Sequence, residues 1–367
     1  MQPTDTTNAS LSLDAYDYQL PEALVAQYPL SQRHESRMMV LNRKTGEISH
    51  HRFYDLPQFL DPGDLVVLNN TKVLPSRFLG NRVGFTGRIE VLLLYPNAEA
   101  TQETSSPVWH ALLRPARKLK EGTVIEFLQI SAGISATMTV YKLEEGGRGQ
   151  VAIDLPKGES VETLMDTLGQ MPIPPYLNRP VEPSDKETYQ TVFASVPGAQ
   201  AAPTAGLHFT PEVLQQLKDK DIGVTEVTLS VSSGTFRSVD ESDITRHVMD
   251  PEYYTVPEAA ARQIHQTRQN GGRIIAIGTT VTKTLETVAA KHQGKITPGS
   301  DWSRLFIYPG FQFQAVDMLL TNFHLPKTTL LMLVSAFANR ESILKAYHQA
   351  VANEYRFFSY GDCMLIL

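Results

Sequence analysis

The chain has 367 residues, of which 42% are hydrophobic and 20% charged, and its formal net charge is −6. These values suit a globular protein of about two domains and exclude a collagen-like or wholly disordered chain and any global basic field. Cys363 is the single cysteine, which excludes an intramolecular disulfide and a cysteine-cluster metal site. Met1–Ser10 lacks an apolar signal core and Leu330–Ala338 is too short to cross a bilayer, so we expect a cytoplasmic protein.

The first part of the chain predicts short elements. We expect a strand at Tyr16–Leu20 and a helical turn at Pro21–Ala26, because proline fits the first position of a helix. Met38–Asn42 and Ile48–Phe53 predict a hairpin, because a glycine suited to positive φ lies between them. Leu65–Leu68 is an apolar strand.

The pattern up to about residue 155 is uniformly β. Short alternating segments are separated by Gly, Pro and Ser turns, which is typical of a small barrel or sandwich. The predicted strands are Ile89–Tyr95, Val108–Leu113, Val124–Leu128, Ser135–Leu143 and Gln150–Leu155. No helix is expected in this block.

Strands and helices alternate in the second half of the chain. The predicted strands are Val224–Val231, Arg273–Ile277 and Leu305–Ile307, and the predicted helices are Glu159–Leu168, Pro257–Asn270, Val281–His292 and Asn339–Asn353. Such alternation indicates an α/β fold with a mostly parallel sheet, flanking helices and ligands at the carboxyl ends of the strands. We therefore expect an α/β domain at 11–63 and 157–367, with an inserted β-barrel module at 64–156.

A weakly charged stretch, Ala201–Thr210, directly precedes a further predicted helix. Pro203 and Gly206 interrupt any regular structure within it. His208 therefore lies on a loop beside a helix N-terminus, whose free N–H groups and positive dipole end suit an anionic or polar ligand. A loop with a buried histidine is the alternative interpretation.

Two further turns are rich in hydroxyl groups. Gly278-Thr279-Thr280 follows a predicted strand and opens a helix, and Gly234-Thr235-Phe236 follows another strand. Hydroxyls and free N–H groups suit a carboxylate or a ribose, although ordinary capped turns have the same residues. The chain has neither a Gly-Lys-Ser/Thr phosphate loop nor a G-x-G-x-x-G turn after a strand, which excludes the commonest nucleotide-binding folds.

Polar side chains gather in two other segments. Asp317, Asn322, His324 and Lys327 supply a carboxylate, an amide, an imidazole and an ammonium, which suit acid–base chemistry and a structural network equally well. Arg114–Lys120 carries four cations and one proline. This segment predicts either a solvated loop or contact with a phosphate backbone.

Motifs spread over the whole chain resemble those of one family. They are Tyr16-Asp17-Tyr18-Gln19-Leu20-Pro21, Pro203-Thr204-Ala205-Gly206-Leu207-His208-Phe209-Thr210, Gly234-Thr235-Phe236, Gly278-Thr279-Thr280, Thr321-Asn322-Phe323-His324-Leu325-Pro326-Lys327 and Tyr355-Arg356-Phe357-Phe358-Ser359-Tyr360-Gly361-Asp362. In this order they resemble the S-adenosylmethionine:tRNA ribosyltransferase-isomerase (QueA) family, from about Asp14 to the last residue.

The resemblance implies an α/β domain with a β-barrel module and an enzyme of queuosine biosynthesis. Members transfer and isomerise the ribosyl part of S-adenosylmethionine onto the 7-aminomethyl-7-deazaguanine wobble base of tRNA. The product is epoxyqueuosine, and adenine and methionine are released. S-adenosylmethionine is then a co-substrate and tRNA the partner, and we expect no metal and no membrane association; oligomeric state is left open.

The resemblance also suggests residue roles. The sulfonium acidifies the adjacent ribose carbon, so a general base can start the reaction, and adenine needs a proton as it leaves. His208 and His324 are the candidates for these proton transfers, with Asp317 as an orienting carboxylate. The expected substrate-binding residues are Pro203, Thr204, Ala205, Gly206, Gly234, Thr235, Phe236, Gly278, Thr279, Thr280, Asn322, Tyr360 and Asp362. The expected tRNA-binding residues are Arg114, Arg117, Lys118 and Lys120.

Several ligand-loop motifs depart from the family pattern. The residues that replace family positions are Asn70, Lys72, Ser230, Ser232, Asp250, Val281 and Lys283, and two family histidines and two family arginines are lost among them. Three interpretations follow. They are the tRNA enzyme itself, a paralogue that uses S-adenosylmethionine on another acceptor such as a small molecule, and a non-catalytic tRNA- or nucleoside-binding protein.

Overall fold

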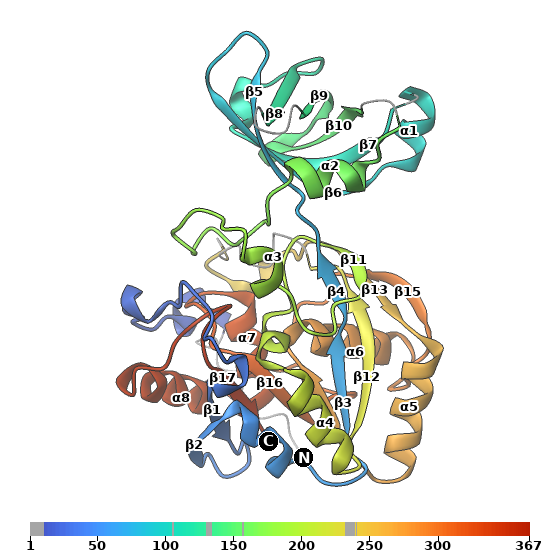
Figure 1. The fold of residues 1–367 in the computed structure, drawn as a ribbon. Coiled ribbons are helices and arrows are strands. Elements are labelled where there is room, and N and C mark those ends of the chain that lie inside the picture. Colours follow the sequence, from blue (N-terminus) through green and yellow to red (C-terminus); the bar gives the residue numbers. More distant parts are fainter. Residues whose placement is uncertain (1–10, 105, 130–133, 156–157, 232–238, 240) are drawn as a thin grey trace.

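The computed structural model describes residues 11–104, 106–129, 134–155, 158–231, 239 and 241–367. A large sheet with helices on both faces forms one part of the molecule, and a closed β-barrel forms the other (Figure 1). The strands of the large sheet are β1 (Arg37–Leu41), β2 (Ile48–Arg52), β3 (Leu65–Asn69), β12 (Gly223–Leu229), β13 (Glu252–Val256), β14 (Ile274–Ile277), β15 (Gly299–Ser303), β16 (Met318–Asn322) and β17 (Cys363–Ile366).

The remaining elements form the barrel, a short ribbon and the helices. The barrel strands are β5 (Arg77–Arg82), β6 (Arg88–Pro96), β7 (Val108–Arg114), β8 (Val124–Gln129), β9 (Ile134–Leu143) and β10 (Arg148–Asp154), and β4 (Thr71–Val73) pairs with β11 (Val196–Ala199). The α-helices are α1 (Ala98–Thr104), α2 (Val161–Leu168), α3 (Asp185–Thr188), α4 (Pro211–Asp219), α5 (Glu258–Gln269), α6 (Thr279–Lys291), α7 (Thr329–Ala338) and α8 (Arg340–Ala352).

The nine strands of the large sheet follow the order β15-β13-β12-β3-β14-β16-β17-β1-β2. The neighbours β12, β3, β14 and β16 are all parallel. On one side of them β13 pairs antiparallel with β12 and with β15, and on the other side β17 pairs antiparallel with β16 and parallel with β1. The predicted α/β class with a barrel module is thus confirmed, with a mixed sheet. Because carboxyl ends of parallel strands meet at one edge, the loops after β12, β14 and β16 lie together.

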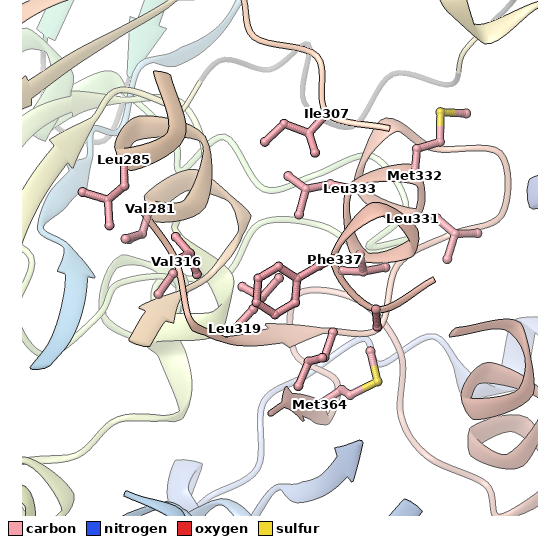
Figure 2. Close-up of a cluster of buried hydrophobic side chains, with 14 of the residues drawn as sticks. Val281, Leu285, Ile307, Val316, Leu319, Leu331, Met332, Leu333, Phe337 and Met364 are labelled. Carbon is pink, nitrogen blue, oxygen red and sulfur yellow. The ribbon is translucent and has the colours of Figure 1, made fainter. Parts of the chain in front are cut away.

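Both faces of the central strands are buried, which explains their continuous apolar runs. On β14, Ile274 and Ala276 face the core that α5, α6 and α7 cover, and Ile275 and Ile277 face the core that α4 covers. Figure 2 shows the first of these cores, where Phe337 of α7 lies next to Leu319 of β16, and Val281 and Leu285 of α6 belong to the same cluster. The central strands are therefore held in place from both sides, and the loops at their ends start from rigid positions.

The barrel closes in the order β10-β7-β6-β5-β8-β9, with every pair antiparallel. Leu164 and Met165 of α2 pack against its apolar interior. β3 lies within the large sheet, although the predicted module begins at residue 64. The barrel strands themselves run from Arg77 to Asp154, since the apolar pattern of β3 continues into the sheet and not into the barrel.

Two predicted strands are wrong. Tyr16 ends a 3₁₀ turn (Leu13–Tyr16), and Asp17–Leu20 is irregular backbone. The alternating pattern arises because Tyr16 and Tyr18 are buried by tertiary packing. Leu305–Ile307 likewise packs its apolar side chains against the core without pairing, and β15 precedes it. In both segments the burial of apolar side chains gives a strand-like sequence pattern, although the backbone pairs with no neighbouring strand.

One helix, α1, lies in the block where none was expected. Its sequence has a single buried residue, Ala100, so it carries no apolar stripe that periodicity can detect. Asn97 stabilises its start, because the Asn97 side chain accepts a hydrogen bond from the N–H of Ala100 at 3.1 Å. Periodicity also missed further elements, which are β4, β5, β11, β13, β15, β16, β17, α3 and α7.

Candidate functional site

A cavity lies at the carboxyl edge of the parallel strands. Its wall comes from the loop before α4, the start of α6, the segment after β16 and the segment before β17. The lining residues are Ala202, Pro203, Thr204, Ala205, Val231, Gly278, Thr279, Thr280, Thr321, Asn322, Phe323, His324, Leu330, Phe358 and Ser359. The edge is the one that the alternation of strands and helices predicted.

Gly278 makes the turn from β14 into α6. Its φ of 89° and ψ of 161° lie in a region that is essentially restricted to glycine. Its N–H donates to the carbonyl oxygen of Leu320 on β16 at 2.7 Å. Thr279 and Thr280 therefore begin α6 at the cavity wall, where the free N–H groups of a first helical turn favour negative charge.

Asn322 at the end of β16 is held in one orientation. Its Nδ2 donates to the carbonyl oxygens of Phe358 (2.8 Å) and Ser359 (3.4 Å), so its Oδ1 is an acceptor. His208 Nε2 lies 3.3 Å from this Oδ1, and His208 Nδ1 lies 2.6 Å from the hydroxyl of Ser36. The network thus assigns the proton to Nε2, and Nδ1 accepts from Ser36.

His208 does not line the cavity itself, but its side chain is hydrogen-bonded to Asn322, which does. It lies on a 3₁₀ turn, Thr204–His208, where a loop was expected, and its ring packs 5.3 Å from that of Phe53. Burial lowers its pKa to about 4, so the imidazole is neutral at pH 7. In this geometry, His208 reaches the cavity through Asn322.

His324 lines the cavity directly. Its Nε2 lies 3.1 Å from the hydroxyl of Thr321, and its main-chain N–H donates to the hydroxyl oxygen of Tyr347 at 3.0 Å. The hydroxyl of Tyr18 donates to its carbonyl oxygen. Burial lowers the pKa of His324 to about 3, which keeps this imidazole neutral as well.

Asp317 lies away from the cavity. It precedes β16, whereas Thr321 lies near the other end of this strand, about 13 Å away at the usual rise per residue. Its carboxylate accepts a hydrogen bond from the N–H of Ile274 at 2.8 Å and so ties β16 to β14. Lys327, from the same polar segment, pairs with Asp14 at 2.8 Å. These two contacts support the structural interpretation of these two residues.

The other predicted substrate-binding residues divide into three groups. Pro203, Thr204, Ala205, Gly278, Thr279, Thr280 and Asn322 line the cavity, Gly206, Tyr360 and Asp362 do not, and Gly234, Thr235 and Phe236 lie outside the described residues. Tyr360 packs its ring 5.9 Å from that of Tyr189. The Asp362 carboxylate accepts hydrogen bonds from the main-chain N–H groups of Arg37 and Arg356, both at 2.8 Å. Burial raises the pKa of this carboxyl group.

The sequence alone did not assign some of the cavity residues. They are Ala202, Val231, Thr321, Phe323, Leu330, Phe358 and Ser359. Four of them, Thr321, Phe323, Phe358 and Ser359, lie in the motifs on which the family resemblance rests. The motifs could therefore have identified these four residues as part of the site. Val231, in the segment after β12, and Leu330 of α7 are apolar residues whose place in the wall depends on tertiary packing.

The basic segment Arg114–Lys120 lies on the barrel, with all four cationic side chains exposed. The β5–β6 hairpin contacts it, because Arg82 Nη1 donates to the carbonyl oxygen of Lys118 at 2.9 Å. The guanidinium of Arg82 covers the ring of exposed Phe85 at 3.3 Å. The hairpin and the basic segment thus form one exposed surface with cations and an aromatic face.

The positions that depart from the family pattern have varied surroundings. Asn70 Nδ2 donates to Glu226 at 2.9 Å, and Lys283 forms a buried ion pair with Glu252. Asp250 pairs with Arg148 of the barrel at 2.7 Å. Val281 is buried, Lys72 is exposed, the Ser230 N–H donates to Tyr253, and Ser232 lies outside the described residues.

The described part of the chain offers neither a cluster of metal ligands nor a membrane-spanning helix. In that part, no three or more His, Cys, Asp or Glu side chains are grouped so that they could hold a metal ion. No helix within the same residues has the length and apolar character needed to span a bilayer.

The chain is similar to known proteins over nearly its whole length. The model of the family described as queuosine biosynthesis protein matches residues 13–366. The crystal structure of an S-adenosylmethionine tRNA ribosyltransferase from Thermotoga maritima shares 35% sequence identity with this chain. That match covers 96% of this chain and 100% of the other, with a TM-score of 0.52. The resemblance of the motifs is thereby confirmed, and the chain belongs to the queuosine biosynthesis protein family.

Proposed function

We propose that this protein transfers and isomerises the ribosyl moiety of S-adenosylmethionine onto the 7-aminomethyl-7-deazaguanine wobble base of tRNA. The aminomethyl nitrogen gains a bond to the ribosyl carbon skeleton. The bonds from that skeleton to adenine and to the methionine sulfur break, which releases adenine and methionine and yields epoxyqueuosine. Family membership over residues 13–366 supports this reaction, as does the ribosyltransferase activity named for the Thermotoga maritima structure.

The cavity has the chemistry that a sulfonium nucleoside needs. Thr279 and Thr280 at the start of α6, with Thr321 opposite, offer hydroxyls for a ribose, and Leu330 and Phe358 offer apolar surface for a base. The observation that carries the proposal is that the imidazole of His324 lies in this wall. A neutral imidazole has one unprotonated ring nitrogen, which can accept the proton that the sulfonium acidifies.

The two imidazoles take different roles in this proposal. His324 faces the cavity and is the general base. His208 donates to Asn322 and holds that side chain in one position in the cavity wall, so it is a positioning residue. Asp317 takes no part, because it lies at the opposite end of β16.

tRNA would contact the barrel in this proposal. The basic segment supplies cations for phosphates, and the adjoining hairpin supplies the aromatic face of Phe85. Such a local basic surface offsets the net charge of −6, which would otherwise repel a polyanion.

One assay separates the possible functions. The protein is incubated with S-adenosylmethionine and with tRNA that bears the aminomethyl deazaguanine, and adenine is measured by chromatography. Adenine release that requires this tRNA supports the proposal. Release with a small-molecule acceptor instead would identify a paralogue with a different substrate, and ligand binding without release would identify a non-catalytic binder. The His324→Ala variant is the negative control.

A further inference from the structure

A second cavity adjoins the first along α6. The two share Thr279, Thr280 and Leu330 as wall residues. The remaining lining residues of the second cavity are Met249, Glu252, Lys283, Leu305, Phe306, Ile307, Thr329 and Leu333. Lys283 follows Thr279 by four positions, so one face of α6 runs from the first cavity into the second.

The second cavity holds one acid–base pair in a mostly apolar wall. Lys283 Nζ donates to Glu252 Oε2, and the two side chains are only 9% and 5% exposed. Six of the lining residues are apolar, and Figure 2 shows two of them, Ile307 and Leu333, lying next to each other. The hydroxyl residues Thr279, Thr280 and Thr329 complete the lining.

A buried ion pair contributes little net stability, because the loss of hydration offsets the attraction between its charges. Here the pair also borders a cavity, so each charged group can reach a ligand without losing its protein partner. A zwitterionic α-amino acid presents a carboxylate next to an ammonium, which complements a lysine next to a glutamate. The apolar wall suits an aliphatic chain that follows these charges.

We propose that the second cavity binds the α-amino acid end of the sulfonium substrate, with Lys283 on its carboxylate and Glu252 on its ammonium. This inference rests on the function proposed above, which puts the nucleoside in the first cavity. The thioether chain then passes Thr279 and Thr280, and Leu305, Ile307 and Leu333 cover its methylene groups. The pair thereby selects S-adenosylmethionine over nucleosides that lack the amino acid.

The test compares two ligands on two proteins by titration calorimetry. S-adenosylmethionine is compared with its decarboxylated form, which keeps the nucleoside, the sulfonium and the ammonium. The proteins are the full chain and the double variant Lys283→Met with Glu252→Gln, which removes both charges so that neither remains buried alone. We expect the native chain to bind S-adenosylmethionine at least about tenfold more tightly, the scale of one charge-assisted hydrogen bond.

In the double variant we expect this preference to shrink to within about threefold. The decarboxylated ligand should also bind more weakly than to the native chain, because its ammonium loses Glu252. A folded double variant that keeps the full preference would overturn the inference. If the double variant does not fold, the native chain still decides, because equal affinity for the two ligands overturns the inference. Failure of the native chain to bind either ligand would instead remove the proposed function itself.

Discussion

The imidazoles of His208 and His324 differ in what they contact. His208 is fixed between Ser36 and the side chain of Asn322, whereas His324 borders the cavity. The sequence alone cannot tell which histidine borders the cavity and which lies behind it, because both residues are histidines within family motifs. The hydrogen-bond network separates them, because the Asn322 amide donates to main-chain carbonyls and so leaves its oxygen to accept from His208.

Substitutions test these roles. We expect His324→Ala to lower the rate of adenine release by about 10²- to 10⁴-fold, the usual contribution of a general base. His208→Gln keeps an N–H donor for Asn322, so we expect its rate to stay well above that of His208→Ala, which lets the amide move. Single-turnover adenine release measures both effects. Equal reductions in the two His208 variants would argue that His208 transfers a proton itself.

Acid should destabilise the protein through these buried imidazoles. The folded pKa of His208 is about 4 against an ordinary 6.5, so the unfolded chain binds more protons between these values. Stability is therefore fully present above pH 6.5 and falls as pH drops toward 4, by about 2 kcal/mol for His208 between pH 7.5 and 5. Urea unfolding of the native chain and His208→Gln at both pH values measures this. The variant should lose about 2 kcal/mol less on acidification than the native chain.

At the scale of elements, the start of α6 decides the shape of the site. α6 is buried along most of its length, and the Glu286 carboxylate accepts from the N–H groups of Gln314, Ala315 and Val316 at 2.9–3.0 Å. The helix is therefore held firmly against the sheet. Its first turn presents Thr279 and Thr280 to the cavity because Gly278 adopts a backbone conformation that residues with a side chain rarely tolerate.

Gly278→Ala tests this dependence. We expect a loss of about 1–3 kcal/mol in unfolding free energy and a weaker affinity for S-adenosylmethionine, because the first turn of α6 must shift. Gly271→Ala is the matched control, since Gly271 also has positive φ (80°) but lies in open space after α5. The control should lose about 1 kcal/mol of stability and keep its ligand affinity. Urea unfolding and calorimetry measure the two quantities, and unchanged affinity in Gly278→Ala would contradict this role of the glycine.

At the scale of the whole molecule, the barrel brings a basic surface to an acidic protein. The barrel is connected to the large sheet by the chain on either side of it, and Arg148 and Asp250 pair across the two parts at 2.7 Å. The cations of the basic segment act at short range, because salt screens exposed charges beyond about 8 Å at physiological ionic strength.

Neutralising the basic segment should weaken tRNA binding. We expect the Gln variant of Arg114, Arg117, Lys118 and Lys120 to bind tRNA less tightly, with a salt slope shallower by about 0.7–0.9 for each phosphate that the protein no longer neutralises. The control replaces Lys44, Lys218, Arg262 and Lys345, which are exposed on the α/β part, and so removes the same charge. Filter binding at several salt concentrations measures the affinity of both variants. An equal decrease in both would point to net charge and not to this surface.

Periodicity and motifs in the chain predicted five of the six barrel strands (β6 to β10), the β1–β2 hairpin, α5, α6 and α8, and the family. The helices and strands depend on the pattern of residues close together in the chain. The family depends on motifs that occur in a fixed order along it. The packing of the folded chain decided that β3 lies in the large sheet, that Tyr16–Leu20 is no strand and that Asp317 lies far from the cavity. It also joined Ser36 to His208 across 172 positions and Glu252 to Lys283 on another element. Contacts between residues so far apart leave no period in one sequence, because they arise only when the strands assemble in their order within the sheet.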